Sequence, residues 1–229
     1  MRTLLRYIWG TIVRPAATFD ALAQVHSLRW AVLVVSLPVL QVWGNIALHA
    51  ALGLDWLGTR GILADPTLVG LFGHLRVDLA GFVPVFAALM PFLAFFGLAF
   101  YAGATQVVGR LWGGRGTFEQ LVTPLAFATA VPNLVIGATS EWLFGVPIDL
   151  LTGQPYWWVS AMYGKLGPAA AAVWNIYVFG VYLAGQYLWI IALGSLAIRR
   201  IQRIPWWSAI LTMLIVFASV FFIESFFVR

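Results

Sequence analysis

Residues 79–109 read LAGFVPVFAALMPFLAFFGLAFYAGATQVVG, and this stretch contains no Asp, Glu, Lys or Arg. An α-helix needs about 20 largely apolar residues to cross the hydrocarbon core of a bilayer. The stretch is long enough for one crossing but too short for two, because two would need about 40 residues. It therefore predicts one long membrane-spanning helix that tilts or extends beyond the hydrocarbon.

The composition of the 229-residue chain points to the same class. Hydrophobic residues make up 62% and charged residues 9%, whereas soluble domains carry about 25% charged residues. The 12 Trp suit membrane–water interfaces. With no cysteine and three His, disulfides, thiolate nucleophiles and Cys-ligated metals are excluded, and a His-based metal site is not expected.

Four further charge-free stretches are long enough to cross, at residues 30–54, 120–140, 166–198 and 204–223. We therefore expect an all-α, polytopic integral membrane bundle of five transmembrane helices over residues 30–229. Residues 1–29 form a separate cytoplasmic arm in this interpretation.

The basic residues predict how the chain is oriented. Nine of the 13 Arg and Lys residues fall on one side of the five predicted spans, namely Arg2, Arg6, Arg14, Arg29, Arg110, Arg115, Arg199, Arg200 and Arg203. Cytoplasmic segments of membrane proteins carry this excess. We expect a cytoplasmic N-terminus and an external C-terminus. The net charge of +5 is then explained by orientation, and nucleic acid is not an expected partner.

The arm contains apolar residues at helical spacing, which are Leu4, Leu5, Ile8, Trp9 and Ile12. Arg2, Arg6 and Thr11 fall on other faces, and Pro15 ends the pattern. This predicts a short amphipathic helix lying in the headgroup plane. The alternative is a plain basic flank before the first span.

Two segments of the chain share a Thr-Phe-acid-x-Leu pattern. The first is Arg14-Pro15-Ala16-Ala17-Thr18-Phe19-Asp20-Ala21-Leu22, and the second is Arg115-Gly116-Thr117-Phe118-Glu119-Gln120-Leu121. Each is interpreted as a helix start, with Thr as the N-cap and the acid in the first turn. Thr117 and Gln120 also fit a capping box.

These segments, with five spans, resemble the Yip (Ypt-interacting protein) domain family in its bacterial form. The matching residues are Pro15, Thr18, Phe19 and Leu22 in the arm, Gly113, Gly114, Gly116, Thr117, Phe118, Gln120 and Leu121 before the third span, and Pro132 within it. The resemblance implies five spans in a bacterial inner membrane, a cytoplasmic N-terminus and an external C-terminus. Eukaryotic members are associated with small GTPases, membrane traffic and the shape of Golgi and ER membranes.

No catalytic pattern accompanies these motifs. The glycine-rich segment 109–116 lacks the Gly-Lys-Ser/Thr ending of a phosphate-binding loop, and neither a nucleophile elbow nor a His-Glu-x-x-His pattern occurs. The spans lack the ionisable residues typical of coupled transport. We expect no enzymatic activity, no cofactor and no bound metal.

A polar stripe in the first span is the main candidate for an intramembrane site. Gln41, Asn45 and His49 lie four residues apart and share one helix face. Their expected partners are Asn133, Thr105, Gln106, Asn175 and Gln186. The stripe either holds the bundle together by hydrogen bonds between helices or lines a path for a polar substrate or lipid headgroup.

Small and aromatic residues suggest surfaces for lateral contact. Residues 169–172 are all Ala, and the predicted external segments 55–78 and 141–165 carry apolar and aromatic side chains. These segments fit either an aromatic belt or a docking surface. We expect a non-enzymatic protein that contacts membrane lipids and another membrane protein or a second copy of itself. The alternative function is a small-solute or lipid permease.

Overall fold

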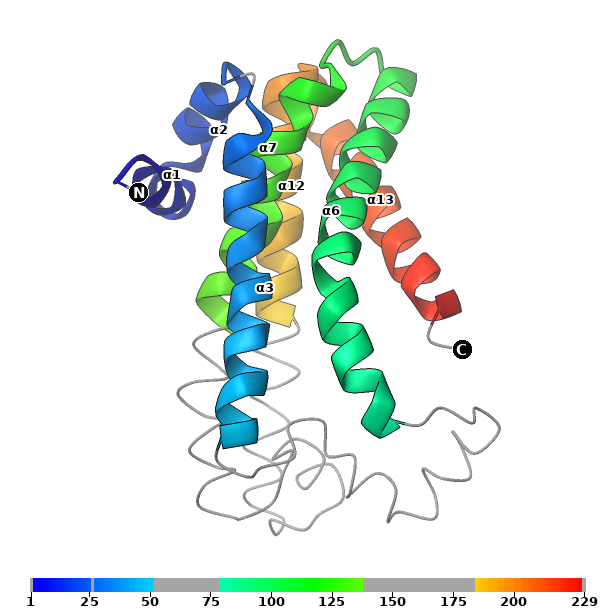
Figure 1. The fold of residues 1–229 in the computed structure, drawn as a ribbon. Helices are drawn as coiled ribbons and strands as arrows, with labels where there is room; N and C mark the ends of the chain where they lie inside the picture. The colour runs from blue at the N-terminus through cyan, green and yellow to red at the C-terminus, as the bar shows by residue number, and fades with distance from the viewer. Residues whose placement is uncertain (1, 26, 52–78, 138–183, 228–229) are drawn as a thin grey trace, which may run out of the picture. The chain divides into compact units, whose positions relative to one another are not determined.

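The computed structural model describes residues 2–25, 27–51, 79–137 and 184–227, and these residues are helical almost throughout. The elements are α1 (Arg2–Val13), α2 (Pro15–Ala23), α3 (Leu28–Ala51), α6 (Leu79–Leu111), α7 (Phe118–Pro132), the π-helix η1 (Asn133–Gly137), α12 (Gln186–Gln202) and α13 (Trp206–Phe227) (Figure 1). No strand occurs in the described part of the chain. The protein is therefore all-α, as the sequence predicts.

The chain divides into two compact units. The first contains Met1–Pro38, Pro91–Val135 and Gln186–Arg229, and the second contains Val39–Met90 and Ile136–Gly185. The second unit includes the later part of α3 and the early part of α6. Most of the packing described below belongs to the first unit.

Helix α7 forms the centre of the first unit. Every side chain from Leu121 to Ala128 is buried, and α7 packs against α12, α2 and α1. Helix α12 also packs against α13 and α2. The apolar core includes Phe19, Leu125, Phe127, Ile198 and Met213, so it joins the arm to the later helices.

The two Thr-Phe-acid-x-Leu segments begin their helices differently. The hydroxyl of Thr117 accepts a hydrogen bond from the Gln120 N–H, and the Gln120 side chain accepts one from the Thr117 N–H. This is the predicted capping box of α7. The prediction of an N-cap at Thr18 is wrong, because α2 begins at Pro15. Proline suits the first turn of a helix, where its missing N–H costs nothing.

The helix α6 ends in a Schellman motif. The Gly114 N–H donates to the Gly109 carbonyl at 2.9 Å, and the Gly113 N–H donates to the Arg110 carbonyl at 3.0 Å. Gly113 has φ +78°, which glycine adopts without steric cost. The α6–α7 turn (residues 112–117) therefore has a defined backbone.

The helix α12 extends past residue 198, where the predicted span ends. It includes Arg199 and Arg200 and ends at Gln202. The predicted span ended at the first charged residue, but arginine is a good helix former, so the helix itself continues. The Arg203 N–H donates to the Arg199 carbonyl at 2.9 Å, and Arg203 has φ 57°. Arg203 therefore caps the helix in the left-handed conformation that glycine usually adopts.

The helix predicted in the arm is present as α1, but the residues buried on it differ in part from the prediction. Thr11 is fully buried, and its hydroxyl donates to the Tyr7 carbonyl at 2.8 Å. The prediction that Thr11 lies away from the apolar face is wrong, because this bond within the helix satisfies the hydroxyl and permits its burial. Leu5, Trp9 and Ile12 are instead exposed.

Two described helices are long and apolar enough to cross a membrane, Ala88–Leu111 and Phe118–Gly137. Two shorter described segments, Leu28–Gly44 and Trp206–Ser219, are also apolar. Two helices of this kind are consistent with membrane association, and the count of five spans stays a prediction. Several predictions fall outside the described residues, namely the early part of the span 166–198, residues 169–172, Asn175, and the segments 55–78 and 141–165.

Candidate functional site

Gln202, the last residue of α12, connects two of the turns between helices. Its side chain is fully buried, and its Oε1 accepts a hydrogen bond from the Gly116 N–H at 2.9 Å. Its backbone carbonyl accepts one from the Arg115 N–H at 3.2 Å. Gln202 thus joins the α6–α7 turn to the α12–α13 link (residues 203–205). We call these two segments, together with the last turns of α6 and α12 from Arg110 and Arg199 onward, the helix junction.

The glycines of this segment make room for Gln202. A Cβ at Gly109 would lie 3.0 Å from the Gln202 Cδ, and one at Gly114 would collide with the Gln202 Oε1. A Cβ at Gly116 would lie 2.9 Å from the Ile201 Cγ2. Three glycines therefore allow close approach of backbone to side chain, and Gly113 provides the positive φ.

Sequence reasoning did not find Gln202. A single glutamine after two arginines at a helix end carries no local signal, because solvent-exposed glutamines at such positions are common. Its partner lies 86 residues earlier in the chain. The spacing of Gly109, Gly114 and Gly116 was the available hint, since glycine often marks close approach by another group.

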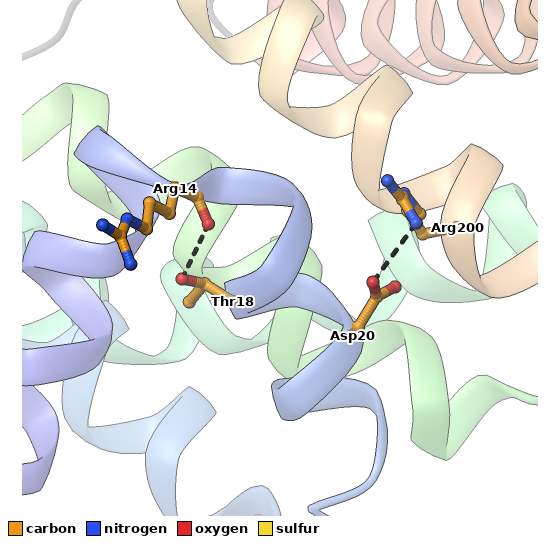
Figure 2. A network of polar contacts seen from close by, with 4 residues as sticks. All are labelled: Arg14, Thr18, Asp20 and Arg200. Carbon is orange, nitrogen blue, oxygen red and sulfur yellow. Dashed lines mark hydrogen bonds and ion pairs between the residues drawn. The ribbon is translucent and has the colours of Figure 1, made fainter.

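The arm is held against this end of the first unit (Figure 1). Phe19 and Leu22 are buried to 1% exposure or less, and α2 packs against α7 and α12. Figure 2 shows the Asp20 carboxylate directed toward Arg200, at 3.2 Å from its Nη1. The Thr18 hydroxyl donates to the Arg14 carbonyl at 3.0 Å. The ion pair thus joins the arm to the end of α12, beside the helix junction.

Arginine and tryptophan side chains combine at the helix junction. The Arg199 guanidinium lies 4.6 Å from the centroid of the Trp206 ring. Trp112 and Trp207 meet edge to face, with 5.0 Å between their centroids. Arg110, Arg115 and Arg203 are exposed, and no described acid pairs with them. The junction therefore presents uncompensated positive charge beside indole rings.

The predicted polar stripe is resolved in part. Gln41 is half-buried within the second unit, while the Asn45 and His49 side chains lie outside the description. Asn133 belongs to the first unit, where its Oδ1 accepts a hydrogen bond from the Gln186 Nε2. Of the predicted partners, Asn133 and Gln186 are thus brought together, as a contact between α12 and the start of η1. Thr105 is buried, and no described group bonds its hydroxyl.

The residues on which the resemblance to the Yip family rests serve structural roles. Phe19, Leu22, Leu121 and Pro132 are buried, and Phe118 is half-buried. Thr117 and Gln120 cap α7. The described residues include no group of His, Asp and Glu side chains that could hold a metal ion. The arrangement is thus suited to holding helix ends together and to presenting charge at a surface.

Comparisons of the chain with protein-family models, curated proteins and solved structures find no match.

Proposed function

We propose that the chain is a non-enzymatic integral membrane protein that acts through lateral contacts with lipids or other membrane proteins. In this proposal it has five spans, resembles the Yip-domain type, and resides in a bacterial inner membrane with its N-terminus in the cytoplasm. It contributes to membrane organisation or to the assembly of a membrane complex. The positive-inside distribution of arginines supports the orientation.

The distribution of apolar side chains carries the proposal. Phe92, Phe96 and Leu111 of α6 are 72%, 68% and 78% exposed, and α13 exposes Ile210, Leu211, Leu214 and Ile215. Inside the same unit lie Thr105, Ser195, Gln202, Ser208 and Thr212. Soluble monomers rarely expose contiguous apolar patches of this extent. A lipid environment explains why large apolar side chains are outside and hydroxyls are inside.

Photo-crosslinking in native membranes tests lateral contact. A photoreactive phenylalanine analogue at Phe96 or Val107, both exposed, should capture lipid or a second polypeptide. The same analogue at Phe127, which is fully buried, is the matched control and should react within the chain. Labelling of Phe96 by a water-soluble reagent in intact membranes would contradict the proposal.

Topology has its own test. Reporter fusions at residues 1 and 229 should report opposite sides of the membrane, with residue 1 cytoplasmic. Reporters on the same side would exclude an odd number of spans. Release of the protein by alkaline carbonate would exclude integral membrane insertion altogether.

A permease is the second candidate. Thr105 Oγ1 and Gln186 Oε1 are buried, and neither has a described hydrogen-bond partner. Buried polar atoms within membrane helices can line a path for a polar substrate. Reconstituted protein that moves solute or lipid between leaflets, and loses this activity in Asn133→Leu while still assembling, would favour this function over lateral contact.

A further inference from the structure

Three arginines of the helix junction are held near one another by the backbone. Arg115 and Arg203 flank the hydrogen bond from the Arg115 N–H to the Gln202 carbonyl, which is 3.2 Å long. Arg110 lies in the last turn of α6, where its carbonyl accepts a bond from Gly113. All three are exposed, and no described acid pairs with them. By contrast, Arg200 in the last turn of α12 pairs with Asp20.

Arg203 keeps its charge at a conformational cost. Its φ of 57° lies in the left-handed region, which residues with a Cβ rarely adopt because of steric crowding. Glycine would fill this position more easily. Strained backbone that bears a charged side chain often belongs to a binding site.

The surroundings of these arginines are those of a bilayer interface. Trp112, Trp206 and Trp207 are partly exposed at the junction, and Leu111 and Val107 of α6 are exposed beside it. On α13, Ile210 and Leu211 are also exposed. Indoles prefer the headgroup level. The exposed apolar side chains of α6 and α13, which meet at their ends through the Trp112–Trp207 contact, suit acyl chains. Exposed arginines thus occur together with indoles and exposed apolar side chains at the junction.

We propose that the helix junction binds the phosphate of an anionic glycerophospholipid, such as phosphatidylglycerol, through Arg110, Arg115 and Arg203. Guanidinium groups match phosphate oxygens in charge and in hydrogen-bond geometry. The acyl chains lie against the exposed residues of α6 and α13. A soluble phosphate would contact the arginines but leave the exposed apolar side chains uncovered. The proposed occupant is therefore a lipid. This inference rests on the proposed integral membrane location.

Reconstitution into nanodiscs tests the site. The bilayer is phosphatidylcholine with a small fraction of phosphatidylglycerol, and the measurement is the number of phosphatidylglycerol molecules that native mass spectrometry finds retained by the released protein. Arg203→Gly removes the charge and keeps the backbone conformation. It should weaken retention about fivefold, on the scale of one basic residue at an anionic surface. Adding Arg115→Gln should weaken it by about a further fivefold.

Arg29→Gln is the matched control. Arg29 is exposed, lies in the first turn of α3, and contacts the Trp30 ring at 5.5 Å from its centroid, as Arg199 contacts Trp206. Unchanged retention in this variant, together with loss in Arg203→Gly, supports a site at the junction. Equal loss in both variants indicates general attraction to the leaflet and overturns the proposal. So does full retention in Arg115→Gln/Arg203→Gly.

Two further measurements distinguish a failure of the proposed lipid site from a failure of the proposed function. Inorganic phosphate added at millimolar concentration should not displace the lipid, and displacement would identify a site for a soluble anion instead. Protein that enters phosphatidylcholine nanodiscs but shows no preference for phosphatidylglycerol overturns this inference and leaves the proposed function standing. Protein that does not enter nanodiscs at all overturns the proposed function.

Discussion

The segments that begin at Thr18 and Thr117 share the Thr-Phe-acid-x-Leu pattern, but they occupy different places in their helices. In α2 the threonine lies in the fourth position, and its hydroxyl bonds the Arg14 carbonyl. In α7 it precedes the helix and caps it. Phe19 is fully buried, whereas Phe118 is half-buried. The preceding residues set this difference, because Pro15 can open a helix and Gly116 meets Gln202 in a turn.

The comparison shows that the leucine is the constant part of the pattern. Leu22 and Leu121 are both buried to 1% exposure or less. The roles of the threonine, phenylalanine and acid depend instead on where the helix begins. Variants at equivalent positions of the two segments should therefore differ in effect.

The phenylalanines should differ most. Phe19→Ala should lower the free energy of unfolding by about 3–5 kcal/mol, because it opens a cavity in the core. Phe118→Ala should cost less than half as much, because its ring is partly exposed already. Unfolding by a denaturing detergent, followed by Trp fluorescence, measures both. Equal losses would mean that the two rings are equally buried in the membrane.

The residue before each threonine comes next. Gly116→Ala should cost about 1–3 kcal/mol, since its Cβ meets Ile201 and Gln202 and the junction must shift. Ala17, the equivalent residue of α2, is exposed, and Ala17→Ser should change stability by about 0.5 kcal/mol or less. The same detergent titration applies. A tolerated Gly116→Ala would show that Gln202 does not pack tightly in the turn.

Replacing each threonine with the isosteric valine isolates the hydroxyls. Thr117→Val should cost about 1 kcal/mol, because it removes the N-cap of α7. Thr18→Val should cost about 0.5 kcal/mol or less, because the Arg14 carbonyl still accepts from the Thr18 N–H at 3.1 Å. Hydrogen exchange of the first turns of α2 and α7 reports each loss locally. Faster exchange in α2 than in α7 would reverse the assignment of the caps.

The acids should give the smallest effects. Asp20→Asn removes an ion pair whose side chains are 42% and 47% exposed, so it should cost about 0.2–1 kcal/mol and less at high salt. Glu119→Gln removes a charge from the first turn of α7, at about 0.3–1 kcal/mol. A double-mutant cycle of Asp20→Asn with Arg200→Gln should show coupling, whereas Glu119→Gln with Arg200→Gln should not.

Much of the helical fold follows from one-dimensional patterns. Charge-free stretches located α3, α6, α7 and α13, because apolar runs of this length form helices when the backbone must satisfy its own hydrogen bonds. The capping box at Thr117 was predictable because its groups lie three residues apart. The break between α1 and α2 was predictable from Pro15.

The junction was not predictable in this way. Gln202 and Gly116 are far apart in sequence, and no periodicity connects them. The burial of Thr11 depends on α1 packing against α2 and α7, which a helical-face argument cannot foresee. Arg203 adopts its left-handed conformation where glycine is usual, so its residue type gives no signal.

The bond between Gly116 and Gln202 also bears on how the protein is made. Translation delivers the chain from its N-terminus, so α6, its Schellman turn and the capping box of α7 can form from local residues alone. The Gly116 N–H has its hydrogen-bond acceptor 86 residues further along the chain, so this bond forms only after Gln202 has been synthesised. The hydrogen bond between Asn133 and Gln186 likewise depends on a residue that is synthesised 53 positions later. The central helix is therefore synthesised well before the residues that satisfy both of its ends, and α12 completes the assembly.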